Sequence, residues 1–139
     1  MEFKLNENPD ETAINEIRHK LQDYNDPYWE VEDRYKYVLT LKDETALVGG
    51  IVFTIFGEWL ELDFFWIDAS RRHQGYGKEL LKKTESFAVS KGCRMSFLNT
   101  FSFQARPFYE KNGYTVVYTQ KNYPIRNTRY FMEKSLKKA

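Results

Sequence analysis

A segment rich in Arg and Gly, residues 71–78, has the composition of a phosphate-binding loop and reads Arg-Arg-His-Gln-Gly-Tyr-Gly-Lys. It lies between a predicted strand and a predicted helix, so several backbone N–H groups can converge on one point. The positive end of the helix dipole favours an anion at that point. Its glycines allow close approach of the main chain to a ligand, and Arg71 and Arg72 add cationic donors. The segment therefore predicts a site for a phosphate or diphosphate group.

Two familiar phosphate-binding patterns do not fit this segment. The Walker A loop needs a Gly five residues before its Gly-Lys pair and a Ser or Thr after it, but Arg72 and Glu79 stand there. The dinucleotide fingerprint needs a third Gly three residues after Gly77, and that residue is Leu80. The remaining pattern is Arg-x-x-Gly-x-Gly, formed by Arg72, Gly75 and Gly77.

Two carboxylates on one predicted strand have the chemistry to assist an amine. Glu61 and Asp63 lie two residues apart, so both point to one face of the strand. An alkylammonium with a pKa of about 10.4 must lose a proton before it attacks, which costs about 4–5 kcal/mol at pH 7. The two carboxylates could supply the base, directly or through water, or attract a cationic amine; a solvated outer face explains them equally well. The other side chains of this strand are predicted to point to the opposite face: Leu60, Leu62, Phe64 and Trp66.

Composition limits the classes of protein to which the chain could belong. Its 139 residues, of which 42% are hydrophobic, predict a single domain over residues 1–139 with a sizeable core. The net charge of +1 gives no reason to expect a nucleic-acid partner.

Cysteine and histidine are scarce, and no long apolar run occurs. Cys93 is the only cysteine, and His19 and His73 lie far apart, so no disulfide and no metal site are predicted. No stretch approaches the roughly 20 apolar residues of a membrane span, and the first residues do not read as a signal peptide. The sequence predicts a cytoplasmic protein with no membrane partner.

Hydrophobic periodicity predicts the first elements. Phe3 and Leu5 suggest a short strand, and Asp10 is a plausible N-cap for a helix that ends at residues 25–27. A buried stripe on this helix is predicted from apolar residues at helical spacing: Ala13, Ile14, Ile17 and Leu21.

The rest of the chain predicts a mixed sheet. Strands at residues 35–41, 46–55 and 59–67 read as an antiparallel meander, with Gly49-Gly50 as a candidate bulge. A helix after the loop at 71–77 then leads to a buried strand at 95–98, which implies a parallel crossover. A helix at 104–112 and strands at 114–118 and 128–134 complete the chain. The fold class is α/β, with an antiparallel meander followed by one central parallel pair.

Two motifs carry a resemblance to a known family. In its strand–loop–helix setting, the Arg-x-x-Gly-x-Gly pattern resembles the coenzyme A loop of the GNAT N-acetyltransferase superfamily. Residues 105–114 read Ala-Arg-Pro-Phe-Tyr-Glu-Lys-Asn-Gly-Tyr and resemble the superfamily's Ala-x-x-x-Tyr-Glu-Lys-x-Gly-Phe/Tyr segment. Residues 99–113 are also similar to a branch of small stand-alone bacterial members.

The resemblance implies how acetyl-CoA is held, with no metal involved. Trp66 and Ile67 are expected to pair with the pantetheine arm like an added strand. For this, the parallel strands ending near Asp68 and Asn99 must splay apart. The diphosphate is expected to be bound by Arg72 and by the N–H groups of the residues that follow: Gln74, Gly75, Tyr76, Gly77 and Lys78.

Two residues near the second motif are further candidates. The resemblance implies that Tyr109 protonates the departing thiolate, for which a reference pKa of about 10 keeps it suitably protonated; packing against the sheet is the alternative. Many members carry an Asn that contacts the coenzyme three residues before the Ala of this motif. Here that residue is Ser102, whose hydroxyl could replace part of the contact.

The resemblance implies a transferase that moves an acetyl group from acetyl-CoA to a primary amine by direct attack on the thioester. The acceptor, a small molecule or a protein lysine, is expected to bind at residues 21–29 and 119–127; these surfaces could equally form a homodimer interface. Two other functions stay open: a non-catalytic acyl-CoA-binding or sensor domain, and a protein-interaction domain without coenzyme.

Overall fold

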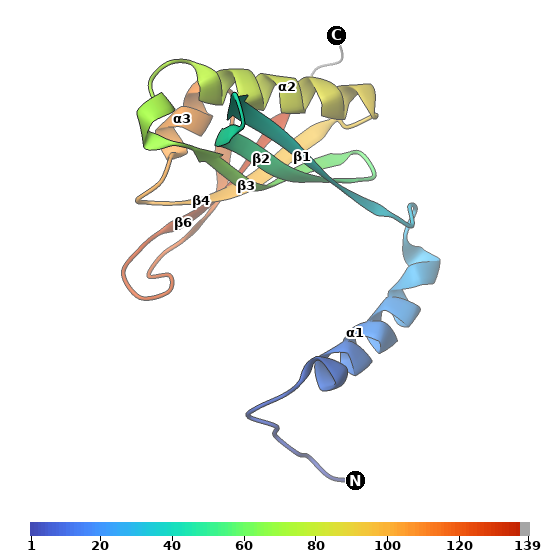
Figure 1. Ribbon diagram of the computed structural model, residues 1–139. Coiled ribbons are helices and arrows are strands. Elements are labelled where there is room, and N and C mark those ends of the chain that lie inside the picture. Colours follow the sequence, from blue (N-terminus) through green and yellow to red (C-terminus); the bar gives the residue numbers. More distant parts are fainter. Residues whose placement is uncertain (137–139) are drawn as a thin grey trace. The chain divides into compact units, whose positions relative to one another are not determined.

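The computed structural model describes residues 1–136 (Figure 1). Its helices are α1 (Glu11–Asn25), α2 (Tyr76–Ser90) and α3 (Arg106–Lys111), with short 3-10 helices η1 (Asp26–Tyr28) and η2 (Ala69–Arg71). Its strands are β1 (Arg34–Asp43), β2 (Ala46–Phe56), β3 (Trp59–Ile67), β4 (Met95–Phe101), β5 (Thr115–Gln120) and β6 (Arg129–Ser135). The chain divides into two compact units, residues 1–32 and the residues from Asp33 onward.

The first unit is a helix preceded by a short irregular segment. Asp10 Oδ1 accepts a hydrogen bond from the Ala13 amide at 3.0 Å, which confirms the predicted N-cap. No residue of α1 is buried within this unit. A 32-residue unit is too small to bury the apolar stripe of this helix by itself, so the burial of that stripe stays a prediction.

The strand predicted around Phe3 and Leu5 is wrong, since residues 1–10 contain no strand. Alternation of two apolar residues supplies no partner for the main chain, and a strand exists only where another strand satisfies its N–H and C=O groups. Within residues 1–136, no helix is long and apolar enough to cross a membrane.

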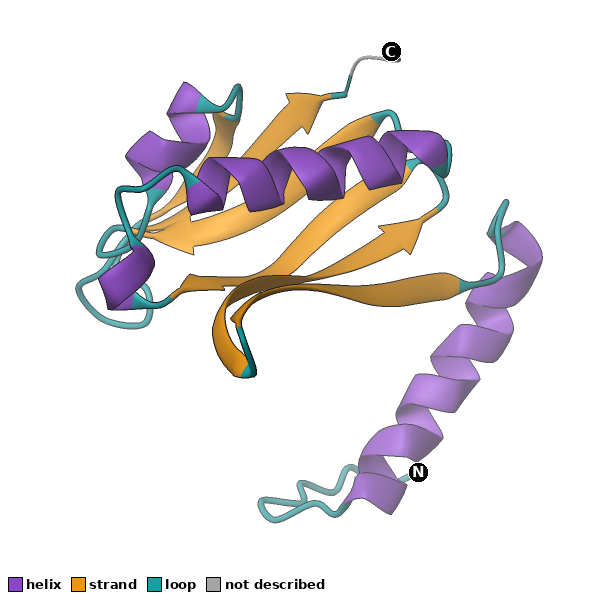
Figure 2. Ribbon diagram, turned by 45° about the horizontal axis from the view of Figure 1, so that its top comes forward, coloured by secondary structure: helices purple, strands orange, loops and turns teal. Residues whose placement is uncertain are grey.

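The second unit contains a six-stranded sheet with strand order β1-β2-β3-β4-β6-β5. The first three strands form an antiparallel meander, β3 and β4 run parallel, and β6 lies antiparallel between β4 and β5. Figure 2 shows α2 and α3 over one face of the sheet. This is the predicted α/β architecture.

The core fills the space between this face and the helices. Ile51, Leu60, Leu81 and Met132 are each 0% exposed there. Burial of such a side chain contributes about 1.5–3 kcal/mol, so the sheet and α2 are held together chiefly by apolar packing.

α3 is shorter than predicted, and a turn held by Gln104 precedes it. Gln104 Oε1 accepts from the Phe101 amide at 2.9 Å, and the Gln104 amide donates to the Phe101 carbonyl at 2.9 Å. Ala105, the N-cap of α3, has a φ of −125° and a ψ of 31°, and its carbonyl accepts from the Tyr109 amide at 3.2 Å, so the helix begins at Arg106.

β3 and β4 separate after a short paired stretch. Their register runs from Trp59 opposite Met95 to Glu61 opposite Phe97 and then stops. β3 nevertheless continues to Ile67 and β4 to Phe101, so the facing edges beyond Glu61 and Phe97 have no strand partner. The splayed parallel pair that was predicted is present.

A bulge in β3 overturns part of the predicted side-chain alternation. Val52 lies opposite Phe64 whereas Phe53 lies opposite Leu62, so Asp63 is an extra residue on β3. The extra residue reverses the alternation, and Phe64 and Trp66 become exposed instead of packing on the core. Their places against the core are taken by Phe65 and Ile67.

Candidate active site

The start of α2 presents main-chain donors with no internal acceptor. Gly75 is the N-cap, at a φ of 88°, and no side chain caps the helix. The first helical bond is donated by the Glu79 amide to the Gly75 carbonyl at 3.1 Å. The amides of residues 76–78 precede that bond, and no side chain in the described part of the chain accepts from them. Such a group of donors at the positive end of a helix can bind an anion.

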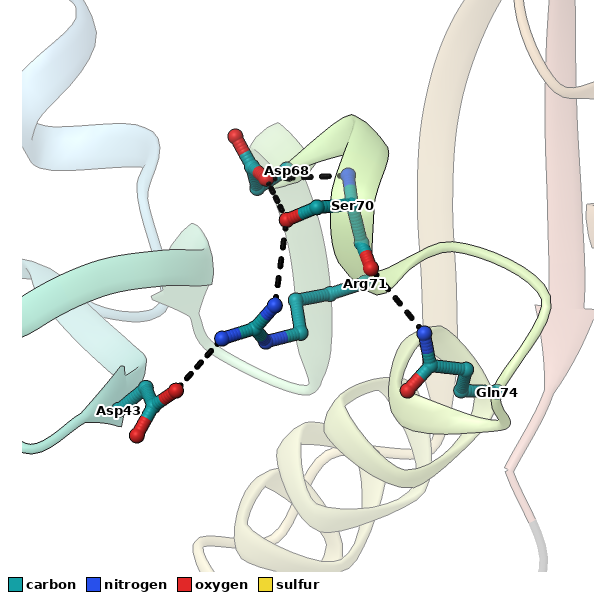
Figure 3. Close-up of polar contacts among 5 residues, drawn as sticks. All are labelled: Asp43, Asp68, Ser70, Arg71 and Gln74. Atoms are coloured by element: carbon teal, nitrogen blue, oxygen red, sulfur yellow. Dashed lines mark hydrogen bonds and ion pairs between the residues drawn. The ribbon is translucent and has the colours of Figure 1, made fainter.

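Polar contacts fix the loop that leads to these donors (Figure 3). Asp68 accepts from the hydroxyl of Ser70 and from its amide, the latter at 3.0 Å, and these bonds lower the pKa of Asp68. Arg71 Nη2 lies 2.5 Å from Asp43 Oδ2 at the end of β1, and Gln74 Nε2 donates to the Ser70 carbonyl at 3.1 Å. Arg71 therefore stabilises the loop, because its charge is already paired with Asp43.

Arg72 fastens the same loop to the end of β3 while leaving most of its donors available. Its Nε donates to the Ile67 carbonyl at 3.1 Å, and the side chain is exposed. The adjacent Trp66 is 45% exposed. Trp66 and Ile67 were predicted to pair with an added strand. The Ile67 carbonyl, one acceptor of this segment, is thus already bonded by Arg72.

A shallow groove adjoins the uncapped helix start. It has a volume of about 580 Å³ and is lined by Gly75, Lys78, Glu79, Lys82, Lys83 and Ser86. Lys78 was a predicted site residue, whereas Lys82 and Lys83 were missed. The spacing of four residues between Lys78 and Lys82 places them on one side of a helix and is the sequence signal that could have found the second lysine.

The two sequence motifs meet at the splayed part of β3. A Cβ atom added at Gly77 would lie 3.4 Å from Phe108 of α3 and 3.9 Å from Phe65 of β3. The rings of Phe65 and Phe108 pack edge to face with centroids 5.8 Å apart. The start of α2, the start of α3 and the unpaired edge of β3 therefore lie together, although neither phenylalanine was predicted as part of the site.

Tyr109 is buried in this same region. Its ring makes edge contacts with Phe65 at 6.3 Å, Phe108 at 5.3 Å and Tyr114 at 5.8 Å. Burial raises the pKa of Tyr109 to about 12. Its hydroxyl has no hydrogen-bond partner within residues 1–136, whereas the Tyr114 hydroxyl bonds Ser96 and Glu85. Tyr109 thus packs on the core and keeps a protonated, uncommitted hydroxyl.

Glu61 and Asp63 share the sheet face opposite α2, as predicted, and both are ion-paired. Asp63 Oδ2 accepts from Thr54 Oγ1 at 2.6 Å and from Lys36 Nζ at 3.3 Å. Glu61 lies 3.6 Å from Arg34, and it is also the last residue of β3 that pairs with β4. Glu61 therefore stands where the two strands begin to separate.

Ser102 is used within the fold. Its hydroxyl accepts from the Thr128 amide at 3.2 Å, and its amide donates to the Thr128 carbonyl at 2.8 Å. These bonds tie the turn after β4 to the residue before β6. The hydroxyl retains a donor, but its geometry favours a structural role over the contact expected for a coenzyme arm.

Comparison with known proteins decides the family. The family model described as Acetyltransferase (GNAT) family matches residues 4–114. The chain belongs to the GNAT acetyltransferase family. It is therefore an enzyme, an acyl-CoA-dependent N-acetyltransferase.

Individual relatives agree with this assignment. The chain is 35% identical over 91 residues to a blasticidin-S acetyltransferase of Streptomyces morookaense, covering 65% of this chain and 67% of that protein. The crystal structure of an acetyltransferase from Bacillus cereus ATCC 14579 superposes with a TM-score of 0.85 and 35% identity, covering 96% of this chain and 98% of that one. An aminoglycoside 6'-N-acetyltransferase complexed with coenzyme A shares the fold, with a TM-score of 0.66, 19% identity and coverage of 94% and 96%.

GNAT acetyltransferases use acetyl-CoA and act on amines, so the site must accept a diphosphate-containing donor. The uncapped amides and the lysine-bearing groove fit that requirement. Among the described residues, no group of three His, Cys, Asp or Glu side chains lies where it could hold a metal ion.

Proposed function

We propose that this GNAT member transfers the acetyl group of acetyl-CoA to a primary amine, which attacks the thioester directly. The observation that carries the proposal is the meeting of three features: uncapped amides at the start of α2, an unpaired β3 edge and the free hydroxyl of Tyr109. When bound, acetyl-CoA supplies an activated acyl group. Residues of the chain bind this donor, stabilise the leaving thiolate and deprotonate the amine.

Binding of the donor is assigned to the main chain of residues 74–78, with Arg72 and Lys78 as cationic contacts. Main-chain donors at a helix start bind phosphate oxygens without side-chain rearrangement. The edge of β3 up to Trp66 and Ile67 would pair with the pantetheine arm, a form of strand addition. Of the proposed donor-binding residues, Ser102 is expected to contribute least to acetyl-CoA binding, because its hydroxyl already accepts from the Thr128 amide.

Tyr109 is proposed to stabilise the leaving thiolate by donating a hydrogen bond. A thiol has a reference pKa of about 8.5, so a tyrosine with a pKa of about 12 holds its proton more tightly than the thiolate would. Complete transfer would be uphill by about 4.8 kcal/mol at this pKa difference. A charge-assisted hydrogen bond stabilises the thiolate by about 1.5–3 kcal/mol without that cost.

Deprotonation of the amine is assigned to Glu61, directly or through water. Asp63 Oδ2 is occupied by hydrogen bonds from Thr54 and Lys36, whereas Glu61 makes a single, longer contact with Arg34, so the Glu61 carboxylate is the more open to a substrate. Asp63 then supplies negative charge that attracts a cationic acceptor to the site.

The acceptor is proposed to be an amine on a small molecule, although a protein lysine would meet the same chemical requirement. The S. morookaense relative is described as acting on blasticidin S, which favours a small acceptor. A single GNAT-type domain over residues 1–139, a cytoplasmic location and a homodimer remain predictions. Analytical ultracentrifugation checks the dimer.

An acceptor screen tests the proposed function. The full chain is mixed with acetyl-CoA and a panel of amines, amino acids and lysine peptides, and release of free coenzyme A is followed. Acceptor-dependent release supports the transferase. Acetyl-CoA binding by calorimetry without release for any amine would instead identify a sensor domain, and no binding at all would refute the donor site.

A further inference from the structure

Arg129 is a half-buried arginine without a carboxylate partner on the sheet face opposite α2. Leu98 points into the core, so its neighbour Asn99 takes the other face, as does Phe101 two residues on. Arg129 lies opposite Phe101 in the β4–β6 register, and its Nε donates to Asn99 Oδ1 at 3.1 Å. No ion pair of Arg129 occurs among residues 1–136.

Other half-buried arginines of the chain have their charge neutralised. Arg71 lies 2.5 Å from Asp43, and Arg106 lies 3.3 Å from Glu110. A guanidinium has five N–H donors, of which Arg129 uses one. Partial burial of the remaining donors has a cost that a bound anion would offset.

Aromatic rings surround this arginine. Its Cζ lies 4.7 Å from the ring centroid of Phe131, 5.2 Å from that of Tyr123 and 5.8 Å from that of Phe101. Such packing holds the guanidinium in place and excludes water from one side.

The same rings extend into an aromatic platform, defined here as Phe101, Phe103 and Tyr123. Phe103 stacks on Phe101 with centroids 5.5 Å apart and planes 9° apart, and Tyr123 stacks on Phe101 at 5.8 Å and 18°. Phe103 is 68% exposed. The platform therefore offers an accessible flat surface next to an unneutralised cation.

The position of this cluster relates it to the reaction. Phe97 is the last residue of β4 that pairs with β3, and Asn99 follows two residues later on the same face. Asn99 thus borders the gap between the splayed strands, and Arg129, on the next strand β6, reaches across β4 to bond it. The segment from Lys121 to Arg129 also contains Arg126 and no acidic residue.

We propose that the acceptor is a small amine that also carries a carboxylate and a flat ring. The carboxylate would pair with Arg129 in the bidentate geometry that a guanidinium allows, and the ring would stack on the aromatic platform. The inference rests on the proposed N-acetyltransferase function and specifies its acceptor.

Matched acceptors test the carboxylate. L-phenylalanine and L-phenylalaninamide share a ring and an α-amine, and kcat/KM for each is measured from coenzyme A release at saturating acetyl-CoA. The amide has the less basic amine and hence more free base at neutral pH, so chemistry alone favours the amide. We expect a preference of about 10- to 100-fold for the acid, the size of a charge-assisted hydrogen bond.

Variants separate recognition from folding. Arg129→Gln should bring the acid-to-amide ratio close to one and leave acetyl-CoA affinity unchanged by calorimetry, and Arg129→Lys should retain part of the preference. Arg94→Gln, an exposed arginine just before the other end of β4, is the matched control and should keep the wild-type ratio. Phe103→Ala should lower kcat/KM for L-phenylalanine more than kcat/KM for L-alanine.

The possible outcomes distinguish this inference from the proposed function. Equal kcat/KM values for L-phenylalanine and L-phenylalaninamide overturn the inference and leave the proposed transferase function intact. The same holds if the protein acetylates other amines but neither of these two. A preference that survives in Arg129→Gln also overturns it. No turnover of any amine in the whole screen contradicts the proposed function itself.

Discussion

The proposed sites on the two faces of the sheet bind their ligands with different parts of the chain. On the face covered by α2, the proposed donor site consists of main-chain amides and packed rings, held by a loop whose polar side chains bond one another. On the opposite face, the proposed acceptor site consists of side chains: the Glu61 and Asp63 ion pairs and the Arg129 cluster.

This difference determines how each site responds to substitution. Main-chain donors carry no side-chain entropy and are lost only when the backbone changes or is blocked. Exposed ion pairs contribute about 0–1 kcal/mol each and are readily exchanged. The donor side should therefore tolerate most side-chain changes except at glycine, whereas the acceptor side should change specificity residue by residue.

The largest effect is expected at Gly75. Gly75→Glu places a negative side chain in open space above the helix start, since a Cβ there meets nothing within 4 Å. Like-charge contact with a diphosphate costs several kcal/mol, so acetyl-CoA affinity should fall by about 100-fold or more in calorimetry.

Gly92→Glu is the matched control. Gly92 lies just beyond the other end of α2, also has a positive φ, of 97°, and also has open space around its Cβ position. Both variants place a side chain at a positive φ, so loss of the diphosphate site is the effect that distinguishes them. Equal acetyl-CoA affinities in the two variants would show that the donor does not bind at the start of α2.

The next effect tests the opposite face. Glu61→Gln should lower kcat/KM by about 100-fold at pH 7, the lower end of general base catalysis. The deficit should shrink as pH approaches the pKa of the acceptor amine, because the free amine no longer needs a base. Asp63→Asn should cost less in rate and more in stability, since Thr54 and Lys36 lose a charged acceptor. A pH–rate profile unchanged in Glu61→Gln would place the base elsewhere.

Tyr109→Phe should reduce kcat by about 10- to 150-fold, corresponding to a lost charge-assisted hydrogen bond of about 1.5–3 kcal/mol. Since burial raises the pKa of Tyr109 to about 12, its protonated form persists below that pH and is lost only as pH rises through it. Any alkaline decline in kcat below about pH 10 must therefore come from another group.

Tyr114→Phe provides the contrast on the same core. It removes buried hydrogen bonds to Ser96 and Glu85 and should cost about 1–3 kcal/mol in the free energy of unfolding, with kcat little changed. Should Tyr109→Phe behave in this way instead, Tyr109 would be a packing residue.

Sequence patterns predicted those features of the fold whose determinants are local. The Asp10 cap and the bounds of β3 follow from neighbouring residues, as does the glycine at the start of α2. Family resemblance then placed Tyr109 beside the same loop. What failed depends on pairing: the bulge at Asp63 is set by the β2 register, so strict alternation put Phe64 and Trp66 on the wrong face.

Long-range contacts were likewise invisible in the sequence. The ion pair of Arg71 with Asp43 and the bond of Ser102 with Thr128 join residues more than twenty positions apart. Arg129 gave no signal at all, because an arginine at the start of a strand becomes informative only when its neighbours and its lack of a carboxylate are seen.

The smallest effect concerns the groove beside α2. Lys82→Gln should weaken acetyl-CoA binding by no more than about fivefold, since one exposed charge contributes about 0.2–1 kcal/mol. Near 1 M salt, where the Debye length is about 3 Å, the difference from wild type should disappear. Lys91→Gln, beyond the far end of the same helix, should have no effect at any salt concentration. A salt-insensitive loss in Lys82→Gln would mean that this lysine donates a specific hydrogen bond, which would place a side chain among the main-chain donors of that face.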